Sequence, residues 1–236
     1  MSARSVSRTA SAAAISLARP AGLLTSTVGM KAVMAVTGIV LFAFVIGHMV
    51  GNLQVFLGEA ALDHYAVFLR EFLHGAGIWI ARVVLLSCAV LHVWSATALT
   101  LGSWAARPIG YRQVRHVEST YASRTMRWGG PLILAFIVYH ILHLTLGRAG
   151  LPFEEGHVYR NVIAGFRIWP VSAFYIVAQL ALGLHLYHGG WSMLQTLGLS
   201  HARWNRLRFA LSLAFTLTVV TGNIMIPVAV LAGWVR

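Results

Sequence analysis

Cysteine and acidic residues are scarce in this sequence, and so is charge of either sign. One cysteine, Cys88, stands among 236 residues, which excludes a disulfide framework and any zinc or iron–sulfur site built from this chain's own thiolates. Charged residues make up 10%, against about 25% in soluble domains, and 58% of the residues are hydrophobic. These deficits exclude an ordinary soluble domain and predict an integral membrane protein. A redox centre in this chain would need histidine ligands.

Long apolar runs take the place of charge. Five are long enough to cross about 30 Å of hydrocarbon at about 1.5 Å per residue: 29–57, 77–103, 128–147, 170–197 and 207–234. The segments between them are polar or contain helix breakers such as Gly58 and Pro108, and we expect loops there. Pro170 suits the opening of the fourth helix, and Pro227 is expected to kink the fifth. The predicted fold class is all-α integral membrane, with five transmembrane helices.

Residues 1–27 are rich in serine and alanine, contain Arg4, Arg8 and Arg19, and have no acid. We interpret them as a cytoplasmic N-terminal tail, although a mitochondrial-type transit peptide has a similar composition. The predicted five-helix domain then covers 28–236.

The lysines and arginines predict an orientation, because cytoplasmic loops carry an excess of both. Twelve fall on the side of the N-terminus: Arg4, Arg8, Arg19, Lys31, Arg107, Arg112, Arg115, Arg124, Arg127, Arg203, Arg206 and Arg208. Five fall on the other side (Arg70, Arg148, Arg160, Arg167 and Arg236), and Arg82, inside the second run, completes the 18. We expect the N-terminus inside and the C-terminus outside. The net charge of +12 reflects this topology and not nucleic-acid binding, because the cations lie between apolar runs.

The first four runs each contain a histidine in their interior: His48, His92, His140 and His185. Imidazole in hydrocarbon is costly unless its nitrogens are satisfied. Hydrogen bonds between helices, worth about 0.6 kcal/mol each, are one explanation. Zinc or copper is another, although these ions favour carboxylate, thiolate or methionine partners at one level. Two b haems, each held by two histidines, account for all four residues.

Depth in the membrane pairs these histidines. Counted from the predicted outer ends of their helices, His48 lies nine residues in and His140 eight, which is about 12–14 Å. His92 lies thirteen residues in and His185 fifteen, which is about 20–22 Å. We predict an outer haem between the first two histidines and an inner haem between the other two.

Three further residues are candidates for contacts with a cofactor. His143 and His188 follow two of the predicted ligands at i, i+3 but match the opposite depth less well. We expect each to bond a haem propionate, a quinone or only a backbone carbonyl. Arg82, near the outer end of the second run, is expected either to snorkel to the interface or to pair with a haem propionate.

Four motifs follow one another in a characteristic order. They are STVGMKAVMAVTGIVLFAFVIGHMVGNLQVFLG with YAVFLR after it, AVLHVWSA, FIVYHILH and GLHLYHGGWSM. Together they resemble the first four helices of the five-helix, di-haem cytochrome b subunit of succinate dehydrogenase and fumarate reductase. In this resemblance, the family's ligand pattern falls on His48, His92, His140 and His185, with helices one and three holding the haem farther from the catalytic subunits.

The resemblance implies partners and a reaction. The family anchors an FAD-containing flavoprotein and an iron–sulfur protein at the inner face of the cell's cytoplasmic membrane. Electrons from succinate then pass through the clusters, the inner haem and the outer haem to a quinone, generally menaquinone. The chain would be the subunit of succinate:quinone oxidoreductase that has no dicarboxylate site. Some relatives carry a proton-transferring glutamate beside the helix-four ligand, and LALGLHLYH has none here.

The sequence offers candidate residues for a quinone site but no defined motif. Glu59, Asp63 and His64 follow the first run and are candidates for exchanging protons with a quinol, with an ordinary solvated loop as the alternative. Ser26 and Lys31 are candidates for contacts with the iron–sulfur partner or a headgroup. Two other functions stay open: a di-haem cytochrome b of a hydrogenase, formate dehydrogenase or nitrate reductase, and a haem-free transporter with a histidine-lined pathway.

Overall fold

The computed structural model describes residues 22–106 and 120–236, while 1–21 and 107–119 lie outside the described residues. Within these ranges the chain is helical and contains no strand. The predicted tail 1–27 falls almost wholly outside them, as does most of the loop after the second run.

Five helices are long and apolar enough to cross a membrane, which confirms the predicted all-α membrane architecture. Helices suit this environment because most backbone hydrogen bonds lie within each segment. They are α1 (Thr27–Asn52) with the 3₁₀ turn η1 (Leu53–Leu57), α3 (Ala76–Ala105), α4 (Tyr121–His140) with the π turn η2 (Ile141–Thr145), α6 (Trp169–Thr196), and α7 (Asn205–Leu231) after the 3₁₀ turn η3 (Ala202–Trp204). The direction in which the N-terminus faces stays a prediction.

Local chemistry explains where these helices begin and end. The Ser26 hydroxyl accepts a hydrogen bond from the Gly29 N–H at 3.0 Å, which caps α1. Gly58 ends η1 with a φ of +99°, a conformation that favours glycine. Pro170 lies in the first turn of α6, as expected. Pro227 lies inside α7, which continues past it.

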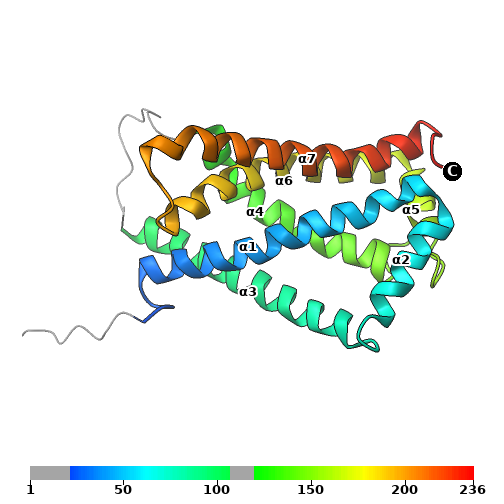
Figure 1. The fold of residues 1–236 in the computed structure, drawn as a ribbon, viewed down its shortest axis with the longest axis horizontal. Coiled ribbons are helices and arrows are strands. Elements are labelled where there is room, and N and C mark those ends of the chain that lie inside the picture. The colour runs from blue at the N-terminus through cyan, green and yellow to red at the C-terminus, as the bar shows by residue number, and fades with distance from the viewer. Residues whose placement is uncertain (1–21, 107–119) are drawn as a thin grey trace, which may run out of the picture.

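Two of the expected loops contain helices, which corrects the sequence-based prediction. The segment after Gly58 forms α2 (Glu59–Glu71), and the segment before α6 forms α5 (Val158–Phe166). Both helices lie at the end of the bundle where the C-terminus is found (Figure 1). They pack against each other, and α5 also packs against α6 and α7.

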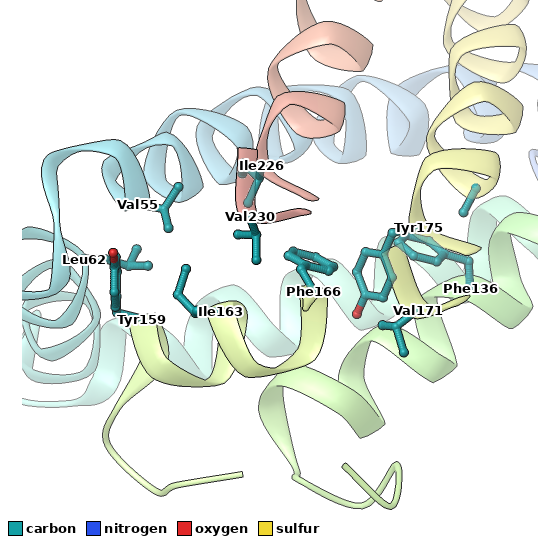
Figure 2. Packing of buried hydrophobic residues seen from close by; sticks show 11 residues of the cluster. Val55, Leu62, Phe136, Tyr159, Ile163, Phe166, Val171, Tyr175, Ile226 and Val230 are labelled. Carbon is teal, nitrogen blue, oxygen red and sulfur yellow. The ribbon is translucent and has the colours of Figure 1, made fainter. Parts of the chain in front are cut away.

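The spans pack as an open bundle. Extensive contacts join α1 to α3 and α6, α4 to α6, and α6 to α7. The largest hydrophobic cluster lies at the α2/α5 end, where side chains of α5, such as Ile163 and Phe166, meet Val230 of α7 and Tyr175 of α6 (Figure 2). A second cluster around Met49, Leu186 and Val219 joins α1, α6 and α7. Across the described ranges, α3 is the span with the least burial.

Candidate functional site

The structure places the four histidines in two facing pairs. The rings of His48 on α1 and His140 on α4 have their centres 5.6 Å apart. The rings of His92 on α3 and His185 on α6 have their centres 6.1 Å apart. We call these the α1/α4 pair and the α3/α6 pair. They are the two pairs that depth predicted, although binding of haem to them stays a prediction.

The spacing of each pair suits two imidazoles on opposite sides of one metal ion. A metal–imidazole bond is about 2.0 Å long and the ring centre lies about 1.1 Å further on, so two such rings have centres about 6.2 Å apart. Within the described residues, neither α1 with α4 nor α3 with α6 is among the helix pairs in extensive contact. The paired imidazoles therefore lie close together between helices that do not pack tightly.

His92 is held in one tautomer by α1. Its Nδ1 lies 3.1 Å from the backbone carbonyl oxygen of Met34 and 3.3 Å from the Thr37 hydroxyl. A carbonyl oxygen only accepts, so Nδ1 carries the hydrogen and donates it. That leaves the lone pair on Nε2, the nitrogen that a metal can bind. Gly38 lies beside the same ring, because a Cβ there would be 3.5 Å from Cε1 of His92.

His140 lies next to a tyrosine that also contacts His143. The hydroxyl oxygen of Tyr175 is 3.4 Å from Nδ1 of His140 and 2.9 Å from Nδ1 of His143. The π turn η2 starts directly after His140 and is closed by the Leu146 N–H, which donates to the Ile141 carbonyl at 2.9 Å. Short π segments often occur at functional sites. His143 lies in this turn and is buried, 3% exposed.

The remaining histidines have fewer polar partners. His48 stacks on Phe44 with ring centres 5.3 Å apart. Nδ1 of His185 is buried with no hydrogen-bond partner among the described residues, and the same is true of Nδ1 of His188. His188 contacts the edge of Trp191 with ring centres 4.9 Å apart. The guanidinium of Arg82 is exposed and lies 4.9 Å from the ring centre of Trp79, an arrangement that suits a snorkelling cation.

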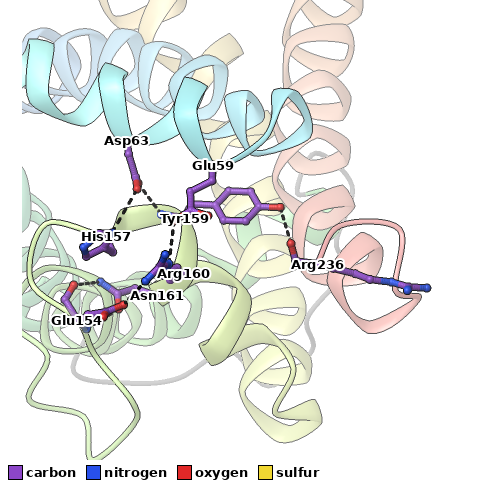
Figure 3. Close-up of polar contacts among 8 residues, drawn as sticks. All are labelled: Glu59, Asp63, Glu154, His157, Tyr159, Arg160, Asn161 and Arg236. Carbon is purple, nitrogen blue, oxygen red and sulfur yellow. Dashed lines mark hydrogen bonds and ion pairs between the residues drawn. The ribbon is translucent and has the colours of Figure 1, made fainter.

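Two of the quinone candidates hold α2 to α5 (Figure 3). Oδ1 of Asp63 accepts the backbone N–H of Tyr159 at 2.9 Å, and Oδ2 lies 3.8 Å from Nδ1 of His157. Glu59 accepts from Arg160 at 2.8 Å. His64, the third candidate, is exposed on α2. The segment is therefore an ordered helical contact and not a solvated loop, and its role toward quinone stays a prediction.

Several charged side chains lie close together at the contact between α2 and α5. Arg160 donates to Glu154 at 3.3 Å in addition to Glu59, and these two carboxylates raise the pKa of Arg160 above its usual range. Ligand atoms of Glu59, Asp63 and His157 lie within 4.8 Å of one another. Arg160 and the Tyr159 N–H already bind two of these three side chains, which accounts for them without an ion.

The donor set fits haem better than a small metal ion. Each pair offers two imidazoles, and no thiolate or carboxylate of the described chain belongs to either pair. A cavity of about 130 Å³ borders His185 and is lined by α4 and α6 residues, including Gly129 and Leu132. That volume is close to the roughly 150 Å³ that holds a benzene ring.

Sequence reasoning missed the residues that orient the ligands. Met34 acts through its carbonyl, which no side-chain pattern reveals. Tyr175 lies ten residues before His185 on α6, a helix in which the sequence pattern pointed only to the histidines. Gly38 had a weak signal, a glycine inside an apolar run, which often marks close approach.

Comparisons with protein-family models, curated proteins and solved structures found no match for this chain.

Proposed function

We propose that this chain is the membrane-anchor cytochrome b subunit of a succinate:quinone oxidoreductase, working as succinate dehydrogenase or fumarate reductase. It carries electrons between an iron–sulfur partner on one side of the membrane and a quinone, menaquinone by resemblance. The observation that carries this proposal is the meeting of four histidines, each from a different candidate membrane span, in two pairs. The order of the sequence motifs around these histidines supports the choice of partner complex.

The chain's own residues hold and separate the two electron carriers. Haem iron, when bound, accepts and releases single electrons. The α1/α4 pair lies closer to the end that carries α2 and α5 than the α3/α6 pair does, because His48 and His140 are near the C-terminal ends of their helices whereas His92 and His185 are near the middle of theirs. FAD, the iron–sulfur clusters and the dicarboxylate site belong to the partner subunits. The chain contributes the path across the lipid and the surface on which the partners assemble.

The deciding experiment is a haem count on the purified complex. A pyridine haemochrome assay is expected to give about two b haems per chain. His48→Ala and His140→Ala should each remove the same haem, while His92→Ala and His185→Ala should each remove the other. His64→Ala is the matched control, because His64 is exposed on α2 and belongs to neither pair. A colourless preparation that is still folded would overturn the proposal and favour a transporter.

The identity of the enzyme is tested by the proteins that purify with the chain. A flavoprotein with covalently bound flavin and an iron–sulfur protein, together oxidising succinate, are the expected partners. A hydrogenase, formate dehydrogenase or nitrate reductase subunit in their place would contradict the proposed complex while leaving the haem pairs intact. The haem count and the partner analysis therefore test separate parts of the proposal.

A further inference from the structure

A buried tyrosine links two histidines at one end of the α1/α4 pair. Tyr175 on α6 is 5% exposed, and its hydroxyl lies between Nδ1 of His143 and Nδ1 of His140. Its ring packs against Phe136, with ring centres 5.1 Å apart, and against Phe166, at 4.8 Å. The ring is therefore held against α4 and α5, so the position of its hydroxyl oxygen is set before any ligand binds.

The number of hydrogens on each group determines which group donates in the hydrogen bonds from His140 to Tyr175 and from Tyr175 to His143. If Nε2 of His140 binds a metal, the neutral imidazole carries its hydrogen on Nδ1 and can only donate from there. The Tyr175 oxygen must then accept from His140, and its single hydrogen must go to Nδ1 of His143. His143 in turn holds its own hydrogen on Nε2, a buried atom with no partner among the described residues. Gly165 of α5 lies against that atom, where a Cβ would collide with it.

We infer that Tyr175 is the positioning residue of the α1/α4 pair, fixing His140 through its hydroxyl with His143 as the acceptor behind it. This inference rests on the proposed function, since it assigns a role toward haem. The two pairs are then held differently: His92 donates to a backbone carbonyl, whereas His140 donates to a phenol oxygen. A hydrogen-bond acceptor on the far nitrogen increases the basicity of a ligating imidazole. Tyr175 therefore tunes one haem of the two.

The test measures the midpoint potentials of both haems in the purified complex by redox titration in the visible spectrum. Tyr175→Phe keeps the packed ring and removes only the hydroxyl. His140 becomes a weaker donor to iron, so one midpoint potential should rise while the other stays unchanged. The midpoint potential that rises should belong to the titration step that is missing in His48→Ala. Tyr139→Phe is the matched control, because its ring lies in the same aromatic cluster, 6.1 Å from that of Tyr175, without a hydrogen bond to a described histidine.

Two variants of His143 give an independent readout. His143→Leu removes the acceptor of the Tyr175 hydroxyl and should raise the same midpoint potential by a smaller amount. His143→Gln keeps a side-chain oxygen that accepts, so its potential should stay nearer the wild-type value. This comparison decides the matter even if Tyr175→Phe loses its haem. Equal potentials in the leucine and glutamine variants, or equal shifts in Tyr175→Phe and Tyr139→Phe, overturn the inference and leave the proposed function standing. Absence of haem from the wild-type complex overturns both.

Discussion

At the scale of single residues, Gly38 leaves room for the ring of His92, one of the predicted iron ligands. A Cβ at this position would make an ordinary contact with the His92 ring, whereas a longer side chain would extend into the ring itself. Gly38→Ala should therefore keep both of the proposed haems. Gly38→Leu should displace His92 and weaken retention of the α3/α6 haem by about tenfold or more, the range seen when the support of a metal ligand is lost. The haemochrome assay on both variants measures this.

The haem proposed for the α1/α4 pair serves as the internal reference for Gly38→Leu. Its absorbance should persist, because His48 and His140 do not contact Gly38. Loss of both haems would indicate a general failure of packing between α1 and α3. Full retention of both would show that the ring has room to move, and would contradict the steric argument.

At the scale of the elements, one carboxylate of α2 caps the first turn of α5. Asp63 accepts the Tyr159 N–H in the first turn of α5, so a side chain from another helix caps it. Asp63→Ala should cost about 1 kcal/mol of local stability, which corresponds to about fivefold faster hydrogen exchange in Val158–Phe166. Exchange followed by mass spectrometry on the purified complex measures this directly.

Asp63→Asn is the matched variant, because the amide oxygen still accepts the Tyr159 N–H. Its exchange in α5 should stay close to wild type, and α6 should exchange equally slowly in all three proteins. If both variants leave exchange unchanged but lower the rate of quinone reduction, the carboxylate acts on quinone protons and the capping role is wrong.

The same elements show what the sequence can and cannot predict. The five spans were predictable because hydrocarbon imposes length and apolarity on each helix separately. The α2 and α5 helices were missed because they are short and polar on one side. Leu62, Ala66 and Leu69 nevertheless recur at helical spacing, as do Val158, Val162 and Phe166, and this signal could have found them. The π turn at His143 and the hydroxyl of Tyr175 depend on tertiary contacts that no local pattern encodes.

The pairing of the histidines could be predicted from the sequence, but the orientation of their rings could not. Depth depends only on position along each helix, so counting residues was enough to select His140 and not His143 as the residue opposite His48, and the structure places the rings accordingly. What orients each ring was beyond reach, because the carbonyl of Met34 and the hydroxyl of Tyr175 approach from neighbouring helices.

At the scale of the whole molecule, the proposed function makes electron flow sensitive to the membrane potential. The five spans contain no aspartate or glutamate, so the chain offers no carboxylate route for protons to accompany electrons across the lipid. Each uncompensated charge that crosses exchanges about 2.3 kcal/mol with the membrane for every 100 mV. With the N-terminus and the iron–sulfur partner inside, electrons that leave succinate move toward the positive outer face, and the potential drives them.

Succinate oxidation by menaquinone in energised proteoliposomes should therefore slow when the potential is collapsed with a potassium ionophore. Reduction of a water-soluble dye that takes electrons directly from the partner subunits should not change, because these electrons never enter the membrane. A menaquinone rate that is independent of the potential would mean that protons follow the electrons by another path or that the quinone site lies on the inner side. Placing His48→Ala in the same vesicles separates the two, since a quinone at the inner side would still be reduced without the α1/α4 haem.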